Sequence, residues 1–266
     1  MTAILAIDAA WTTTNPSGVA VVSHHGGSWR CRGISPSYEA FYRLPDGEAP
    51  DWSAKHVDRG PEPDRLISVA QRMVGNVAIE VVTVDMPLSL APIIGRRSAD
   101  DAISRAFGGK GCSAHTPSTS RPGKIAETIR DGLSEYRLAT AGTSAGTRPA
   151  LVEVYPHPAL LALTGSDYRL PYKVARSGRY WRGASVTEKK ARLLEQYRLI
   201  LRALSKRIEG IHVPLPEPDN VTLTGLKTYE DGIDALVCAW AGIEYLEGRA
   251  AAYGDADAAV WVPTDE

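Results

Sequence analysis

Short apolar runs separated by turn residues dominate the start of the chain. An apolar run over residues 3–8 ends in Asp8, and two further runs, 18–23 and 28–34, flank the glycine-rich turn 24–27. Glycine-rich turns between β-branched runs are typical of an antiparallel meander. We therefore expect three consecutive antiparallel strands.

Further along, the hydrophobic pattern alternates between helical and strand-like periods. Apolar residues at helical spacing predict helices, and shorter runs closed by proline or turn residues predict strands. The expected helices cover residues 63–74, 96–107, 124–139, 159–163, 187–208 and 229–249. The expected strands cover residues 79–85, 149–154 and 260–262, the last of them at a sheet edge. This order predicts an α/β fold with a mixed sheet.

Three segments are rich in proline, glycine or polar residues. They are an insertion or loop at 35–61, a flexible loop at 108–123 and a loop of cations and aromatics at 165–186. A chain of 266 residues without internal repeats is long enough to bury a sizeable core. We expect a single domain over residues 1–266 that carries these three insertions.

Composition narrows the class of protein. The chain is 44% hydrophobic and 23% charged, as ordinary soluble globular proteins are. No apolar stretch approaches the roughly 20 residues that span a bilayer, and the first residues lack a signal-peptide pattern. Three scattered cysteines fit neither a disulfide framework nor a paired zinc motif. We expect a cytoplasmic protein without membrane association, and its oligomeric state stays open.

The net charge of −1 conceals an asymmetry. Residues 168–208 carry twelve Lys or Arg against two acids, whereas residues 209–266 carry twelve acids against two basic residues. A basic helix is often only a solvated surface, but the cations at 169–182 alternate with Tyr and Trp. Such alternation suits phosphate contact with base stacking. Nucleic acid is the expected partner, with DNA and RNA both open.

Acidic residues end or open several elements that can face a common point. Asp8, Asp85 and Glu153 close or follow apolar strand runs, and Asp231 and Asp234 lie where the last long helix begins. A carboxylate at the end of a buried strand is costly unless a cation compensates it. Hard divalent cations prefer oxygen ligands, and two such ions can cleave a phosphodiester. The pattern predicts a catalytic Mg²⁺ or Mn²⁺ site.

Each of these acids also has an ordinary structural explanation. Asp8 and Asp85 can each cap or initiate a turn, and the helix dipole favours Asp231 near a helix start. Glu153 can be an exposed residue of an edge strand. The joint pattern is more specific than any single member.

Basic and titratable residues are candidates for substrate binding. His115 lies in a polar loop, where it can relay protons near neutral pH or have no role. His157, directly after Tyr155-Pro156, reads as a turn or packing residue. The expected substrate-binding residues are Arg96, Arg97, Lys110, His115, Lys173 and Lys189.

These motifs resemble a known superfamily. Ile7-Asp8-Ala9, Asp85 and the segment 231–236 together resemble the ribonuclease H-like superfamily, and 231–236 is similar to the active-site helix of RuvC-like resolvases. Val84–Ser89, Val152–Pro156 and Val260–Pro263 extend the resemblance to a predicted-nuclease family, domain of unknown function 429 (DUF429).

The resemblance implies a ribonuclease H-like mixed five-stranded sheet, with three antiparallel strands followed by parallel strands and flanking helices. It also implies a nuclease that uses two divalent ions. Asp8 would bridge the ions, Asp85 and Asp234 would be ligands, and Asp231 or Glu153 would complete the shell. Resolvases carry Glu where this chain has Asp85, so Glu153 would be an addition.

Other function classes fit parts of the pattern. Actin-like and sugar-kinase ATPases share the core, but they duplicate it and carry glycine-rich phosphate loops. In this chain, residues 8–18 contain a single glycine, Gly18. A non-catalytic nucleic-acid-binding module would keep the basic face without needing all five acids. A small-nucleotide phosphohydrolase would apply the same acids to a smaller substrate. A serine hydrolase is not expected.

Overall fold

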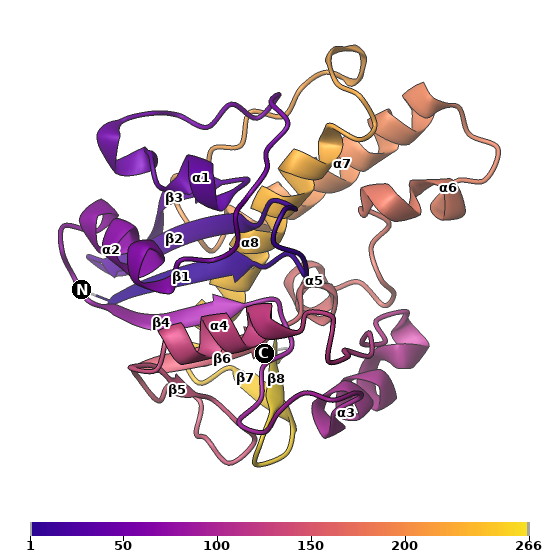
Figure 1. Ribbon diagram of the computed structural model, residues 1–266. Helices are drawn as coiled ribbons and strands as arrows, with labels where there is room; N and C mark the ends of the chain where they lie inside the picture. The colour runs from indigo at the N-terminus through magenta and orange to yellow at the C-terminus, as the bar shows by residue number, and fades with distance from the viewer. Residues whose placement is uncertain (1, 265–266) are drawn as a thin grey trace.

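A mixed sheet lies at the centre of the computed structural model, which describes residues 2–264 (Figure 1). The sheet has eight strands, where the sequence pattern predicted six and the resemblance implied five, in the order β3-β2-β1-β4-β6-β8-β7, with β5 pairing beside β6. The strands are β1 (Thr2–Asp8), β2 (Gly18–His25), β3 (Ser28–Ser35), β4 (Ile79–Val84), β5 (Arg137–Leu138), β6 (Ala150–Val154), β7 (Ala250–Gly254) and β8 (Ala259–Pro263).

Strand directions divide the sheet into two parts. β2 is antiparallel to both β1 and β3, which confirms the expected meander. β4 is parallel to β1, β6 to β4 and β8 to β6, so the sheet continues with parallel strands. The expectation that 260–262 is an edge was wrong, because β7 pairs antiparallel on the outer side of β8. The Ala-rich sequence of β7 lacks the β-branched signal that reveals strands.

Helices surround this sheet. They are α1 (Tyr38–Phe41), α2 (Pro63–Met73), α3 (Ser98–Phe107), α4 (Lys124–Gly132), α5 (Pro156–Thr164), α6 (Ser177–Tyr180), α7 (Val186–Leu204) and α8 (Leu226–Leu246), with 3-10 turns η1 (Leu44–Asp46), η2 (Gly108–Lys110), η3 (Val174–Arg176) and η4 (Pro218–Asn220). The helix expected at 124–139 ends at Gly132, because residues 137–138 pair with β6 instead. Within residues 2–264, no helix combines the length and apolar character that a membrane span requires.

The segment 35–61 is more than an open loop. It forms α1 and a 3-10 turn, and it buries Tyr38, Phe41 and Trp52. Trp52 stacks on Tyr229 of α8 with ring centroids 5.6 Å apart. The insertion is therefore part of the packed molecule.

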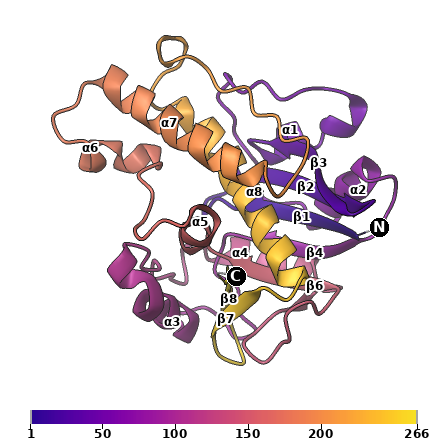
Figure 2. The same cartoon turned by 180° about the vertical axis from the view of Figure 1, so that it is seen from behind.

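Alternate residues of each central strand face opposite sides, as strand geometry requires. In β1, Ile4 and Ala6 pack with α5, α7 and α8, whereas Leu5 and Ile7 pack with α1, α2 and α4. Figures 1 and 2 show these two helical layers on opposite faces of the sheet. Two apolar cores result, one on each face.

A glycine lets α8 approach the sheet closely. A Cβ atom on Gly18 would lie 2.0 Å from the carbonyl oxygen of Asp231, so no larger residue fits there without a shift. Gly18 pairs directly with Asp8 across β1 and β2. This contact brings the first turns of α8 over the carboxyl end of β1.

Candidate active site

Two aspartates end neighbouring parallel strands at the same level. Ile7 pairs with Val84, and the backbone N–H of Asp85 donates to the carbonyl of Ile7 at 2.9 Å. Ile7 and Val84 face the α2 side, so the next residues, Asp8 and Asp85, face the α8 side. Both line a cavity of about 720 Å³. Among residues 2–264, no group donates a hydrogen bond to either side-chain carboxylate.

A segment of the basic loop closes on the acids of α8. The Tyr172 hydroxyl donates to Oδ1 of Asp234 at 2.7 Å, and Nζ of Lys173 contacts Oδ2 of the same carboxylate. The backbone N–H of Val174 donates to Oε2 of Glu230 at 2.6 Å, and Lys173 lies 3.4 Å from Oε1. Tyr172 is therefore fully buried and is not a surface for base stacking.

Glu230 belongs to this cluster although the sequence prediction omitted it. Lys227 forms ion pairs with both Glu230, at 3.2 Å, and Asp231. Glu230 and Asp234 are four residues apart, which places both on one face of α8. That spacing was the signal in the sequence, whereas the resemblance directed attention to Asp231.

The crowded carboxyls change their proton affinities. Burial, followed by the nearby charge of Asp8, raises the pKa of Asp85 well above its usual value. Burial also raises the pKa of Asp8, against the opposing effect of Lys173, and it raises the pKa of Asp234 to about 6. A further cation beside these groups would favour their ionised forms.

The residues fit a divalent ion in part. Across residues 2–264, no three or more His, Cys, Asp or Glu side chains are grouped so as to hold a metal ion. Asp8 and Asp85 offer carboxylate oxygens, which Mg²⁺ and Mn²⁺ prefer, without a competing donor. Asp234 can join them only after the ammonium group of Lys173 leaves it. The expected set of Asp8, Asp85 and Asp234 is thus not preassembled.

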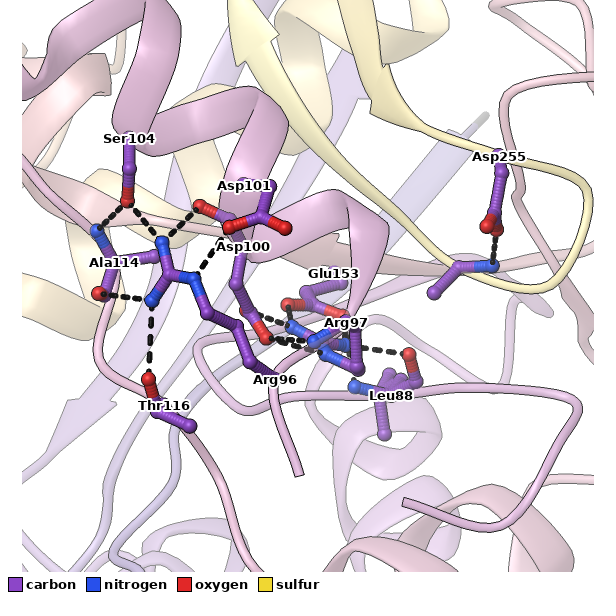
Figure 3. A network of polar contacts seen from close by, with 11 residues as sticks. Leu88, Arg96, Arg97, Asp100, Asp101, Ser104, Ala114, Thr116, Glu153 and Asp255 are labelled. Atoms are coloured by element: carbon purple, nitrogen blue, oxygen red, sulfur yellow. Dashed lines mark hydrogen bonds and ion pairs between the residues drawn. The ribbon is translucent and has the colours of Figure 1, made fainter. Parts of the chain in front are cut away.

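Glu153 lines a neighbouring pocket together with Asp85, but its carboxylate is taken up by an ion pair of its own, contrary to the expectation. It pairs with Val84 in register, so its side chain leaves the strand on the same face of the sheet as Val84. Both its oxygens accept from Arg97, at 2.6 and 2.7 Å, and Oε2 also accepts from the backbone N–H of Leu88 (Figure 3). Arg97 also binds Asp100, and only 8% of its side chain is exposed. We therefore correct the roles of Glu153 and Arg97, which form an internal ion pair joining α3 to β6.

Arg96 is also committed to the protein itself. Its guanidinium donates to Asp101 at 2.5 Å, to Ser104 at 2.7 Å and to Thr116 at 3.0 Å (Figure 3). These bonds fasten the loop 108–123 to α3. The expected contact between Arg96 and substrate is corrected accordingly.

Of the remaining expected substrate-binding residues, two line the carboxylate cavity and two do not. His115 lines the carboxylate cavity. Lys173 also lines it, but its charge is paired with acids. Lys110 in η2 and Lys189 in the first turn of α7 are not among the residues that line the cavity.

One segment matches the nucleophile-elbow pattern G-x-S-x-G, namely Gly142-Thr143-Ser144-Ala145-Gly146. A working elbow joins a strand to a helix and exposes the serine at the turn. Here the segment is a turn between β5 and β6, and no helix follows it. The match carries no hydrolase site.

Comparison with known proteins identifies the family. The family model described as "Protein of unknown function (DUF429)" matches residues 7–258. The chain belongs to the DUF429 family. No curated protein and no solved structure is significantly similar to it. Asp8, Asp85 and the acids of α8 all lie within the DUF429 match.

Proposed function

We propose that this DUF429 protein is a divalent-metal-dependent nuclease with a ribonuclease H-like fold. The observation that carries the proposal is the pair Asp8 and Asp85, with donor-free carboxylates on adjacent parallel strands at a cavity of about 720 Å³. The order β3-β2-β1-β4-β6, antiparallel and then parallel, supports the ribonuclease H-like assignment. The basic segment 168–208 supports a polyanionic substrate.

The chain's own residues prepare the site for cation and substrate. Bound Mg²⁺ or Mn²⁺ would supply activation of water and stabilisation of the leaving oxygen. Asp8 and Asp85 would hold the cation, and Asp234 would add a ligand if Lys173 were displaced. The Tyr172 hydroxyl holds the Asp234 side chain in place, and Lys227 compensates Glu230 and Asp231.

Cleavage of a panel of labelled nucleic acids tests the function. Single-stranded, duplex, hybrid and branched substrates are incubated with Mg²⁺, with Mn²⁺ and with chelator. Asp8→Asn keeps the shape but removes a ligand charge, so we expect cleavage to fall by more than about 100-fold. Asp64→Asn, an exposed acid in α2, is the matched control and should retain full activity. Undiminished cleavage by folded Asp8→Asn would refute the assignment.

A second candidate is a nucleic-acid-binding module without catalysis. It is favoured by the ion pairs of Lys173 and Lys227, which already compensate three acids of α8. This candidate predicts binding that does not depend on metal and no cleavage of any substrate in the same panel.

A further inference from the structure

The carboxylate cavity continues into a second pocket of about 280 Å³. Residues that line both spaces are Trp11, Asp85, His115, Lys173 and Glu230. The second pocket is also lined by Arg169, Arg176 and His157, none of which the sequence prediction assigned to a site. Any group bound there would lie beside Asp85.

Two arginines in this pocket lack an acidic partner. The pocket's other cations, Arg97 and Lys173, are neutralised by the acids that they contact. Among the described residues, the guanidinium of Arg169 donates to Nε2 of His157 and, at 3.5 Å, to the carbonyl of Gly111, and its buried Nε has no partner there. Within residues 2–264, neither Arg169 nor Arg176 forms an ion pair with an acid. The lining as a whole carries four cations and four acids, and within residues 2–264 Arg169 and Arg176 are the two of these cations that no acid pairs.

His157 contributes an unused polar atom to the same wall. Only 6% of the residue is exposed, and no partner among residues 2–264 reaches its buried Nδ1. Burial and the nearby charges of Lys173 and Arg169 hold the pKa of His157 well below its usual value, so the ring is neutral. Because Nε2 faces the donating guanidinium of Arg169, the ring proton belongs on Nδ1. The neutral ring thus accepts from Arg169 and holds that guanidinium in the pocket wall.

We propose that this pocket binds a phosphate group of the substrate through Arg169 and Arg176. Guanidinium groups match phosphate geometry and form charge-assisted hydrogen bonds to it. Four acids also line the pocket, namely Asp85, Asp100, Glu153 and Glu230. Asp100 and Glu153 are paired with Arg97, and Glu230 with Lys173, so a phosphate would lie against Arg169 and Arg176. The inference rests on the proposed nuclease function in one respect, namely that this phosphate lies next to the bond that is cleaved. Such a phosphate is either a terminal monoester or a backbone phosphodiester.

Equilibrium binding in chelator tests the pocket without relying on cleavage. The probes are 3′-labelled single-stranded oligonucleotides that carry either a 5′-phosphate or a 5′-hydroxyl. Their binding is measured by fluorescence anisotropy. We expect Arg169→Gln combined with Arg176→Gln to weaken binding about tenfold or more. Arg105→Gln is the control, because Arg105 is exposed on α3 and does not line the pocket. Arg176→Gln alone covers the case in which the double variant does not fold.

The two probes distinguish the sources of the phosphate. Loss confined to the 5′-phosphorylated probe assigns the pocket to a terminal monoester, and equal loss with both probes assigns it to the backbone. Unchanged binding of both probes by folded Arg176→Gln and by the double variant would overturn the proposal. The binding measurement is made in chelator and does not depend on metal. It therefore tests the phosphate pocket even if the cleavage panel shows no nuclease activity.

Discussion

At the residue scale, charge compensation decides the state of the site. Asp8 and Asp85 have no donor among the described residues, whereas Asp234 is held by Tyr172 and Lys173. Placing like charges in buried surroundings disfavours ionisation, and the lysine ammonium offsets this effect. Lys173 is 19% exposed, so its side chain has a route to solvent when a metal ion replaces it.

Metal affinity should depend on pH, and Asp234 should contribute to this dependence beside Asp8 and Asp85, whose pKa values are also raised. Burial raises the pKa of Asp234 to about 6 from its ordinary 3.8, against the opposing charge of Lys173. The raised pKa of Asp234 thus stabilises the folded protein at pH values below the ordinary pKa, and this contribution to the free energy of unfolding is lost as pH rises through about 6. Because a metal ligand must be ionised, we expect Mg²⁺ affinity to increase about tenfold from about pH 5 to about pH 7. Calorimetric titration measures it, and Asp234→Asn should reduce the dependence to the part that comes from Asp8 and Asp85. A pH-independent affinity of the unsubstituted protein would exclude Asp234 as a ligand.

Asp85→Asn should separate stability from metal binding. The pKa of Asp85 lies well above its usual value, so its contribution favours folding at low pH and is lost as pH rises above that usual value. The neutral amide should therefore raise the melting temperature of the metal-free protein at neutral pH. In the unsubstituted protein, Mg²⁺ at a hundredfold excess over Kd should add about 2.7 kcal/mol to the free energy of unfolding. Thermal melting with Mg²⁺ and with chelator measures both effects, and equal Mg²⁺ stabilisation of Asp85→Asn would contradict the ligand assignment.

At the scale of elements, contacts between distant segments build the site. Residues 172–174 bind the acidic face of α8, and Arg97 joins the start of α3 to Glu153 of β6. The first of these contacts pairs Glu230 and Asp234 with the loop that carries Lys173. The second stabilises the wall of the smaller pocket, and Arg97 forms no ion pair with Asp8 or Asp85.

Arg97→Met should destabilise the protein rather than weaken substrate binding. Removing one partner of a buried ion pair leaves Asp100 and Glu153 uncompensated, which costs about 3–5 kcal/mol. Arg105→Met, on the exposed side of the same helix, should change stability by about 0.5 kcal/mol or less. Urea denaturation measures both variants. Unchanged stability together with lower substrate affinity would restore Arg97 as a substrate contact.

The predictable elements are those whose patterns are local. Alternation and glycine turns were sufficient for β1 to β3, and helical spacing was sufficient for α2 and α7. Strand pairing depends on residues far apart in the sequence. Residues 137–138 form β5 because β6 lies beside them, and the local pattern wrongly assigned them to a helix. The same limit applies to the site. Asp8 and Asp85 end neighbouring parallel strands, but only the structure shows that Arg97 takes up both oxygens of Glu153.

At the scale of the whole molecule, the basic residues continue outward from the proposed phosphate pocket. The segment that carries Arg169 and Arg176 leads through α6 into α7, which packs beside α8 on one face of the sheet (Figure 2). Polyanions bind to such surfaces by releasing counterions, so affinity falls as salt rises. A nucleic-acid strand whose phosphate is bound in the pocket would therefore run along α6 and α7.

Lys189 tests this path. It lies in the first turn of α7. Nζ of Lys190 donates to the carbonyl of Val221, whereas the side chain of Lys189 has no hydrogen bond or ion pair within residues 2–264. We expect Lys189→Gln to lower the slope of log affinity against log salt by about 0.7–0.9, the effect of one lost phosphate contact. Lys124→Gln is the matched control, because α4 covers the opposite face of the sheet. Anisotropy titrations in chelator at several salt concentrations measure both variants. Equal slopes for Lys189→Gln and the unsubstituted protein would mean that α7 faces away from the bound strand, because a lysine that meets a phosphate must release its counterion.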